Sequence, residues 1–154
     1  IEHYVNKDQE GLDTEVKALK AYHYEIINEL FNDKKHPVFG DIAILFDDLN
    51  RTLNREPSLN FDHDYDQIIC FGELLSTKII TYYLQTQNIK AEWKDVRFSI
   101  KTNNAYREAR VNWEVTKELV PKHFQFGKNQ ILVTQGFLGS TVDNITTTLG
   151  FRRT

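Results

Sequence analysis

The fold class is decided by one stretch near the end of the chain, QILVTQGFLGS at residues 130–140. Residues 130–134 form a short apolar run, which is typical of a buried parallel strand. The run ends in a glycine-bearing turn at residues 135–140. A second strand is predicted upstream, because residues 89–96 alternate between apolar and polar side chains. Strands that alternate with helices in this half of the chain predict an α/β layered fold.

Amphipathic helices are predicted upstream of these strands. Apolar residues recur at three- and four-residue steps over residues 13–32 and again over residues 38–53, which is typical of one buried helix face. A third helix follows, and Asp64 with Gln67 three residues later resembles the capping box that starts a helix. Gly72 lies within this helix at a cost of about 1 kcal/mol relative to alanine. We interpret Gly72 as a point of close backbone packing or of ligand contact.

A polar segment separates the two predicted strands. Residues 97–110 are predicted to form a loop, and Asn112 is predicted to cap a helix that runs through Val120. Four basic side chains belong to this loop, and the neighbouring Glu108 and the acidic balance of the chain favour an ordinary solvated surface over a phosphate site. These basic residues are Arg97, Lys101, Arg107 and Arg110.

The composition excludes several classes of protein. The chain has 154 residues, enough for one domain, with 40% hydrophobic and 27% charged residues. The 19 basic residues against 22 acidic ones give a net charge of −3, so no general electrostatic attraction to nucleic acid or to an anionic membrane is expected. No apolar run approaches the ~18 residues that a membrane span requires. A single cysteine cannot form an internal disulfide, which favours a reducing cytoplasmic setting.

Residues with reactive or metal-binding side chains are interpreted as structural. Residues 62–66, DHDYD, contain metal-ligating side chains without a recognised ligand spacing, so a solvated turn that leads into a helix is the better interpretation. His23 lies on an amphipathic helix, and Cys70 lies on the apolar side of another without an obvious histidine partner. We therefore expect no metal ligands and no catalytic cysteine in this chain.

Three blocks in the second half resemble one enzyme family in their order and separation. The blocks are FGELLSTKI at residues 71–79, VTQGFLGS at 133–140 and TTTLG at 146–150, with DVR at 95–97 followed by KTN at 101–103. Together they cover most of residues 67–150 and resemble the aspartokinases. The N-terminal helices are similar to that family only in their general character.

The resemblance implies a fold and a reaction. The fold is the three-layer α/β/α sandwich of the amino acid kinases (carbamate kinase-like), of which this chain would be a partial version with a helix-rich N-terminal half. Aspartokinases transfer the γ-phosphate of ATP to the side-chain carboxylate of L-aspartate. The product is 4-phospho-L-aspartate, in the first step of lysine, threonine and methionine biosynthesis. The resemblance further implies ATP and Mg²⁺ as cofactors of the full-length enzyme, a cytoplasmic location and a homodimer.

The resemblance also implies a set of substrate-binding residues. The glutamate of the family's Gly-Glu pair holds the ammonium group of the substrate, and Glu73 occupies that position here. A carboxylate at a helix turn relieved by glycine can pair with the amine of a small zwitterion. The family's Thr-Gln-Gly-Phe loop lines the aspartate pocket, which implies that Thr134, Gly136 and Phe137 do so here.

The chain also departs from the family pattern. It begins at Ile1, contains no methionine and lacks the KFGGTS motif, whose lysine contacts the transferred phosphoryl group. Where the family continues LGRGGSD, this chain has LGFRRT, so Phe151 stands in place of the arginine that grips the aspartate carboxylate. We therefore expect an internal fragment of a longer protein. Residues 1–150 would be the aspartate-binding half of the catalytic domain, and residues 151–154 a tail foreign to the family. We expect no catalytic residue and no bound cofactor in this fragment, and no activity from it alone.

Two other functions stay open at this point. One is a non-catalytic helical interaction module that merely inherits the kinase sequence. The other is a different amino acid kinase, acting on glutamate, acetylglutamate or a nucleotide, which the TTTLG block and the FGE sequence at 71–73 disfavour. Protection of the Glu73 and Gly136 regions by L-aspartate would separate the interaction module from an aspartokinase.

Overall fold

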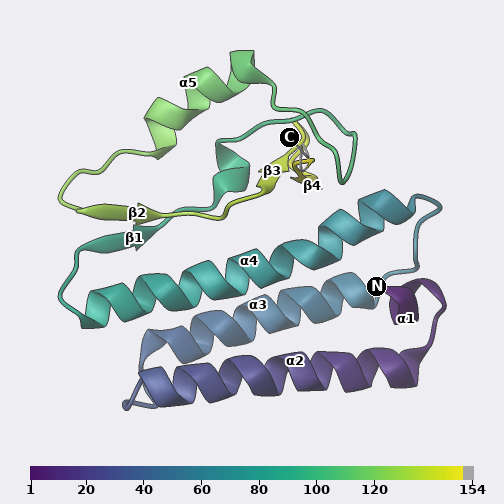
Figure 1. Ribbon diagram of the computed structural model, residues 1–154, viewed down its shortest axis with the longest axis horizontal. Helices are drawn as coiled ribbons and strands as arrows, with labels where there is room; N and C mark the ends of the chain where they lie inside the picture. Colours follow the sequence, from purple (N-terminus) through teal and green to yellow (C-terminus); the bar gives the residue numbers. More distant parts are fainter. Residues whose placement is uncertain (151–154) are drawn as a thin grey trace.

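The computed structural model describes residues 1–150, and its elements lie on the two sides of one long helix. The elements are α1 Glu2–Val5, α2 Gln9–Leu30, α3 Pro37–Leu53, α4 Phe61–Thr86, β1 Ala91–Trp93, the 3₁₀ helix η1 Val96–Phe98, α5 Trp113–His123, β2 Ile131–Val133, β3 Leu138–Ser140 and β4 Thr146–Thr148. Helices α2, α3 and α4 lie side by side, and the β1–β2 pair lies between α4 and α5 (Figure 1). This order confirms the predicted α/β class and the helix-rich N-terminal half.

Polar side chains cap the helices. Helix α2 begins earlier than its apolar stripe predicts, because Asp8 accepts a hydrogen bond from the Gly11 amide at 3.0 Å. Helix α3 begins at Pro37, whose missing N–H would have had no partner in a first turn anyway. Asn112 caps α5 as predicted, since its side chain accepts from the Val115 amide at 3.3 Å. No helix in the described part of the chain has the length and hydrophobicity needed to cross a membrane.

The predicted start of α4 at Asp64 is wrong. Asn60 caps the helix by accepting a hydrogen bond from the His63 amide at 3.1 Å, so the helix begins at Phe61. Asp64 lies inside the helix, 5% exposed, where its carboxylate accepts from the Ser58 amide at 2.7 Å and contacts His63 at 2.9 Å. Asn60 and Asp64 are both capping residue types, and the position of Ser58 against the helix decides between them.

The hydrophobic core lies mainly between α3 and α4. Ile42 and Phe46 of α3 and Leu75 of α4 are fully buried. Helix α2 adds Ile27 to the same cluster, whereas its Tyr22 is 61% exposed. Helix α2 therefore covers the outside of the helical layer with only part of the stripe that its sequence predicts.

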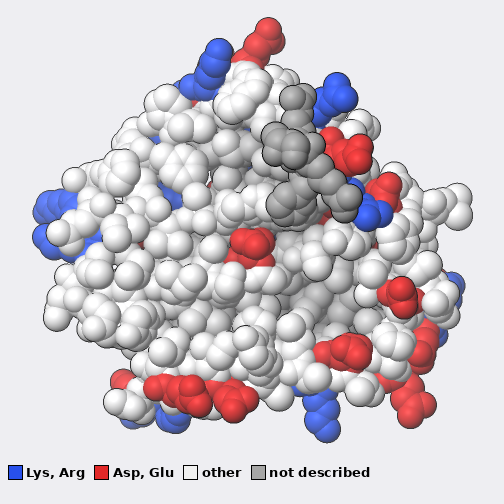
Figure 2. Space-filling model, viewed as in Figure 1, with Lys and Arg blue, Asp and Glu red and all other residues white. Residues whose placement is uncertain are grey.

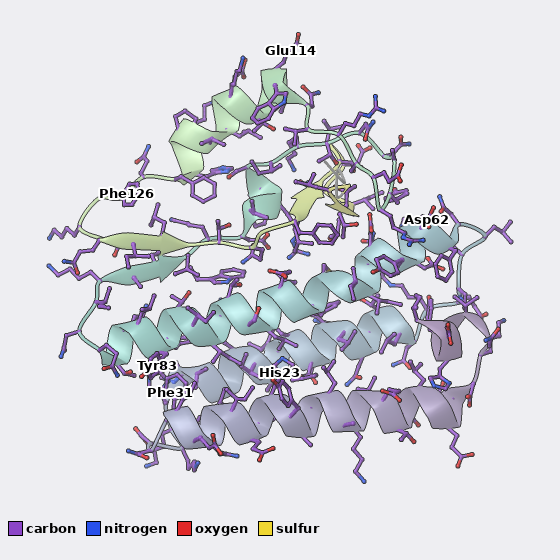
Figure 3. All side chains as sticks on the ribbon, viewed as in Figure 1. His23, Phe31, Asp62, Tyr83, Glu114 and Phe126 are labelled. Atoms are coloured by element: carbon purple, nitrogen blue, oxygen red, sulfur yellow. The ribbon has the colours of Figure 1, made fainter. Side chains whose placement is uncertain are left out.

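His23 has the structural role that its place on α2 predicts. The side chain points from α2 toward α3 (Figure 3), and its ring meets the Phe46 ring edge-on at 5.8 Å. Its Nδ1 lies 2.8 Å from the Leu19 carbonyl oxygen, one turn earlier in the same helix. The ring is buried and hydrogen-bonded within α2, so it serves packing.

The two predicted strands pair with each other. Strands β1 and β2 run parallel, with Ala91 opposite Ile131 and Trp93 opposite Val133. The parallel arrangement confirms the prediction from the apolar run, but the predicted burial of β2 is wrong. Ile131 is 38% exposed, and the rest of β2 is only half-buried. In the described residues this sheet has two strands, which are too few to cover β2 on every side.

A second pair of strands was not predicted from the sequence. Strands β3 and β4 form an antiparallel ribbon, with Leu138 opposite Thr148. The ribbon is held to α4 by Asp66, which is fully buried. The Asp66 carboxylate accepts hydrogen bonds from the Thr148 amide at 2.8 Å, the Thr148 hydroxyl at 2.6 Å and the Arg107 amide at 3.0 Å. One side chain of α4 thus holds both β4 and the segment around Arg107.

The loop at residues 97–110 is not the uniformly solvated surface that its composition predicts. Lys101 is only 6% exposed, and its ammonium donates to Ser140 Oγ at 2.8 Å and to Asn144 Oδ1 at 2.7 Å. Burial lowers the pKa of Lys101. Arg97 forms a bidentate pair with Asp95, with Nη2 to Oδ2 at 2.6 Å and Nε to Oδ1 at 2.9 Å. These two basic residues are therefore structural, while the rest of the predicted basic set is exposed: Arg107 and Arg110.

Substitutions of Asp66 are expected to destabilise the chain, and to do so more when they remove both carboxylate oxygens than when they keep one. Asp66→Ala leaves two backbone amides and a buried hydroxyl without their acceptor, so the free energy of unfolding should fall by about 3 kcal/mol. Asp66→Asn keeps one acceptor oxygen for the amides and should cost about 1–2 kcal/mol. Urea denaturation followed by circular dichroism measures both. The exposed Asp47→Ala is the control, and a loss below ~1 kcal/mol for Asp66→Ala would contradict the assigned role.

Candidate functional site

Glu73 stands half-exposed near the middle of α4. Within residues 1–150 its carboxylate has no hydrogen bond or ion pair, although its backbone carbonyl accepts from Thr77. The preceding Gly72 is exposed, and a Cβ added there would meet nothing within 4 Å. The interpretation of Gly72 as a point of close backbone packing is therefore wrong for the described residues. Open space beside an unpaired carboxylate leaves the alternative interpretation, contact with a ligand.

Thr134 follows β2 and holds a buried hydroxyl without a partner. Its Oγ1 is the buried side-chain polar atom in the described residues that makes no hydrogen bond. An unsatisfied buried hydroxyl costs about 1–3 kcal/mol, so such groups in native proteins mark a place where a water, an ion or a ligand completes the structure. Thr134 was predicted as a substrate-binding residue from the family resemblance alone.

Gly136 and Phe137 complete the predicted loop. Gly136 is exposed, and an added Cβ would meet nothing within 4 Å. Phe137 has φ of +66°, the left-handed region that side chains other than glycine and asparagine rarely adopt. Such a conformation costs on the order of 1 kcal/mol and persists only where the surroundings enforce it. Here the Phe137 carbonyl accepts from the Leu149 amide at 2.8 Å, and the ring packs against the core.

The Thr77 hydroxyl joins the predicted loop to the helix of Glu73. It donates to the Glu73 carbonyl at 2.6 Å and accepts from Trp93 Nε1 at 3.0 Å and from Gln135 Nε2 at 3.1 Å. The Gln135 side-chain oxygen in turn accepts from the Val96 amide at 2.9 Å. The structure thus brings two separately predicted regions together, one at Glu73 and the other between Thr134 and Gly136. We call this set of hydrogen bonds the Thr77 junction.

Sequence reasoning did not single out Thr77 or Gln135. Both side chains are buried, at 8% and 3% exposure, and both are polar. Thr77 stands one helical turn after Glu73, on the buried side of an otherwise apolar stripe, and that pattern is the signal that could have identified it. Gln135 lies between two predicted substrate residues, but its partners are 58 and 39 positions away in the sequence.

The surface over this region is poor in charge. Figure 2 shows most lysine, arginine, aspartate and glutamate side chains along the rim of this face. The area over α4 and the strands is largely uncharged, apart from an acidic group over the middle of α4.

The other reactive side chains do not build a second site. Burial raises the pKa of the Cys70 thiol to about 12, so the sulfur stays protonated and is not a nucleophile. The carboxylates of residues 62–66 are each engaged elsewhere: Asp62 with Arg107, Asp64 with Ser58 and His63, and Asp66 with Thr148. Within residues 1–150 no group of three histidine, cysteine, aspartate or glutamate side chains could hold a metal ion.

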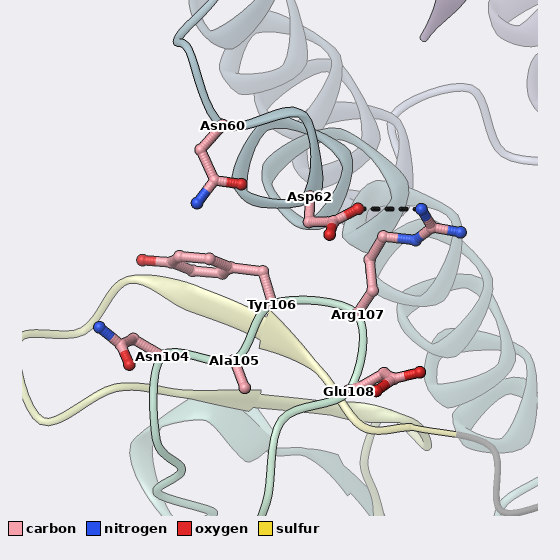
Figure 4. Close-up of a pocket in the computed structure, with 7 residues that line it drawn as sticks. All are labelled: Asn60, Asp62, Asn104, Ala105, Tyr106, Arg107 and Glu108. Atoms are coloured by element: carbon pink, nitrogen blue, oxygen red, sulfur yellow. Dashed lines mark hydrogen bonds and ion pairs between the residues drawn. The ribbon is translucent and has the colours of Figure 1, made fainter.

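A polar cavity of about 530 Å³ lies at the start of α4, away from the predicted residues (Figure 4). It is lined by Asn60, Asp62, Asn104, Ala105, Tyr106, Arg107 and Glu108. An ion pair between Arg107 Nη1 and Asp62 Oδ1 at 2.9 Å closes one side. None of the predicted substrate residues lines it, and neither of the paired charges is buried. The predicted residues around Glu73 therefore form the candidate site.

Comparison with curated proteins finds aspartokinases. No family model matches the chain. It is similar to lysine-sensitive aspartokinase 3 of Escherichia coli (strain K12), with 34% identity over 86 residues, covering 55% of this chain and 19% of that protein. It is also similar to an aspartokinase of Rickettsia prowazekii (strain Madrid E), with 33% identity over 91 residues, covering 56% of this chain and 19% of that protein. The chain thus spans about a fifth of the length of these relatives.

Solved aspartokinase structures match nearly the whole chain. Aspartokinase III of E. coli, in complex with aspartate and ADP, superposes with a TM-score of 0.81 at 23% identity, over 93% of this chain and 32% of that one. The same enzyme in complex with lysine and aspartate gives 0.81 at 23% identity, over 94% and 32%. Aspartate kinase of Clostridium acetobutylicum gives 0.65 at 22% identity, over 92% and 27%. These likenesses confirm the predicted fold, that of part of an aspartokinase, and the sequence resemblance is confirmed over about half of the chain.

Removal of the unpartnered Thr134 hydroxyl is expected to stabilise the ligand-free chain. Thr134→Val replaces the hydroxyl with a methyl group of similar size, so the desolvation cost disappears and the free energy of unfolding should rise by about 1 kcal/mol. Thr134→Ser is the matched control, because it keeps the hydroxyl and should give no gain. Thermal and urea denaturation measure the three proteins. A less stable Thr134→Val would mean that the hydroxyl already has a partner, against the inference of an incomplete site.

Proposed function

We propose that this chain is part of an aspartokinase, an enzyme that transfers the γ-phosphate of ATP to the side-chain carboxylate of L-aspartate and forms 4-phospho-L-aspartate. The observation that carries the proposal is the pairing of two incomplete polar groups in one place. Within residues 1–150, the Glu73 carboxylate on α4 is unpaired and the buried Thr134 hydroxyl after β2 has no partner. The Thr77 junction ties the backbone of Glu73 to Gln135, the residue next to Thr134. Aspartokinase relatives at 33–34% identity, and the aspartate complexes of E. coli aspartokinase III, support the same function.

Each proposed substrate residue has a physical task. Glu73 would hold the ammonium group of L-aspartate through a charge-assisted hydrogen bond, which is stronger than one between neutral groups. The Thr134 hydroxyl would gain the partner that it lacks by bonding to the substrate. Gly136 has no Cβ to block the approach of a ligand to the backbone, and Phe137 would form an apolar wall. These side chains bind and orient the amino acid, which raises the rate by proximity.

We propose ATP and Mg²⁺ as cofactors of the full-length parent enzyme only, and not of this chain alone. E. coli aspartokinase III is described in complex with ADP, which supports ATP as the phosphoryl donor of the parent enzyme. Within residues 1–150 no group of three histidine, cysteine, aspartate or glutamate side chains would hold a metal ion by itself. We therefore assign no step to a metal held by this chain.

The extent of the domain, the pathway, the location and the oligomeric state of the parent enzyme are also proposals. Residues 1–150 are proposed as the aspartate-binding half of the catalytic domain; residues 151–154, proposed as a foreign tail, lie outside the described residues. The place in lysine, threonine and methionine biosynthesis follows from the reaction. A cytoplasmic location and a homodimeric parent enzyme rest on the family resemblance.

Glu73 is expected to recognise the ammonium group and not the carboxylates of the ligand. The wild-type chain should bind L-aspartate weakly and succinate, which lacks the amine, more weakly by tenfold or more, because a charge-assisted hydrogen bond contributes about 1.5–3 kcal/mol. Glu73→Ala should abolish this discrimination, and Glu73→Gln should restore only part of it, since an amide keeps an acceptor oxygen without the charge. Titrations followed by NMR chemical shifts at residues 73 and 134–137 measure both ligands.

The matched control for Glu73 is Glu114→Ala, an exposed glutamate near the start of α5. It should leave both affinities unchanged. Equal binding of L-aspartate and succinate by the wild-type chain would reject the ammonium site, and the absence of binding would favour the non-catalytic interaction module.

The 154-residue chain alone is expected not to form aspartyl phosphate. Phosphoryl transfer depends on positive charge arranged around the γ-phosphate. The sequence contains no KFGGTS motif, and Phe151 stands where the family has an arginine. A coupled assay of ADP release with L-aspartate and MgATP measures the rate, with E. coli aspartokinase III as the positive control. Turnover well above the enzyme-free background would show that this chain supplies the missing charge from other residues.

A further inference from the structure

Thr77 and Gln135 occupy a position that ordinary core packing does not require. Both are buried polar side chains, at 8% and 3% exposure, next to the apolar core. Burying polar groups is unfavourable unless each is hydrogen-bonded, and an apolar pair of the same size would pack as well. Here the hydrogen bonds are complete and run between separate segments: α4, β1, η1 and the loop after β2.

We propose that Thr77 and Gln135 are positioning residues, which hold the loop at residues 134–137 at a fixed place relative to Glu73. The inference rests on the proposed function, because it treats Glu73 and that loop as the two sides of the aspartate site. Neither residue contacts the substrate in this proposal. Thr77 acts on both sides at once, since its hydroxyl donates to the Glu73 carbonyl and accepts from the Gln135 amide.

The loop depends on such a restraint because two of its residues supply no side-chain bond of their own. Within residues 1–150 the Thr134 hydroxyl has no hydrogen-bond partner, and Gly136 has no side chain. Phe137 is in the left-handed region at φ of +66°, which a free loop would leave. In the loop between β2 and Phe137, the Gln135 side chain supplies two hydrogen bonds: one ties the loop to Thr77 of α4, and the other ties it to the Val96 amide. Helix α4, with 26 residues packed against α3, is the rigid element to which the loop is tied.

Trp93 makes the junction observable. Its indole N–H donates to Thr77 at 3.0 Å, and the Lys78 ammonium lies 3.7 Å from its ring centroid. Tryptophan emission responds to the loss of a hydrogen bond and to the movement of a nearby charge. The other tryptophan, Trp113, is 62% exposed, so Trp113→Phe leaves Trp93 as the single reporter.

The test compares three substitutions in the Trp113→Phe background. Thr77→Val keeps the shape and removes the hydroxyl, and Thr77→Ser keeps the hydroxyl. Thr81→Val is the matched control, because Thr81 is a buried threonine of the same helix, 3% exposed, whose hydroxyl donates only to the Thr77 carbonyl at 2.8 Å. Hydrogen exchange of the Val96 and Leu149 amides and Trp93 emission are measured without ligand. L-aspartate affinity is then measured on the same proteins.

We expect Thr77→Val to accelerate exchange of the Val96 amide by about tenfold, to change Trp93 emission and to weaken L-aspartate binding by about tenfold or more. Thr77→Ser should restore all three, and Thr81→Val should leave them unchanged. If exchange and aspartate affinity are the same in Thr77→Val and Thr81→Val, the inference is overturned. If Thr77→Val loosens the loop but the wild-type chain does not bind L-aspartate, the junction still positions the loop and the proposed function fails instead.

Discussion

The buried carboxylate of Asp66 is the interaction on which the arrangement of this chain depends. It is fully buried, yet it accepts hydrogen bonds from a backbone amide near residue 107 and from both the amide and the hydroxyl of Thr148. A carboxylate is stable in such a place only when donors surround it, and these donors come from segments 41 and 82 residues further along the chain. The chain after α4 therefore returns to the start of α4, and the short β3–β4 ribbon is anchored there.

Helix α4 packs against α3 on one side and bonds to the strands and loops on the other. Its leucines and isoleucines belong to the core shared with α3, which also takes in Val96 and Leu138 on the strand side. Only toward the strands does it also present the buried polar side chains of Asp66 and Thr77, which bond to those segments. Apolar packing tolerates small shifts between helices, whereas hydrogen bonds need their partners within a few tenths of an ångström. The hydrogen bonds of Asp66 and Thr77 thus set the strands and loops precisely, and the candidate site lies on that side of α4.

The candidate site contains polar groups without partners and a disfavoured backbone conformation, which lower the stability of the chain alone. Among the residues that the structure describes, the buried Thr134 hydroxyl has no partner and the Glu73 carboxylate is unpaired, and Phe137 adopts a disfavoured backbone conformation. Each feature is unfavourable or neutral in the chain alone, and together they occur around a single junction. Features of this kind are typical of binding sites, because groups that are satisfied within the protein have nothing left to offer a ligand. The rest of the described chain pairs its buried polar atoms, including those of Lys101 and Arg97.

The sequence by itself determined helices α2 to α5 apart from their exact starts, the two parallel strands and the cap of α5, because these depend on local periodicity and on a single capping side chain. Its family resemblance also indicated the candidate residues around Glu73 and Thr134. The tertiary structure alone decided that α4 begins at Phe61, that Lys101 and Arg97 are structural and that β2 is half-exposed. It alone also joined Glu73 to the loop through Thr77 and Gln135. The physical reason is distance along the chain. A hydrogen bond between residues 58 or 82 positions apart produces no periodic pattern in the sequence, because only the folded backbone brings its donor to its acceptor.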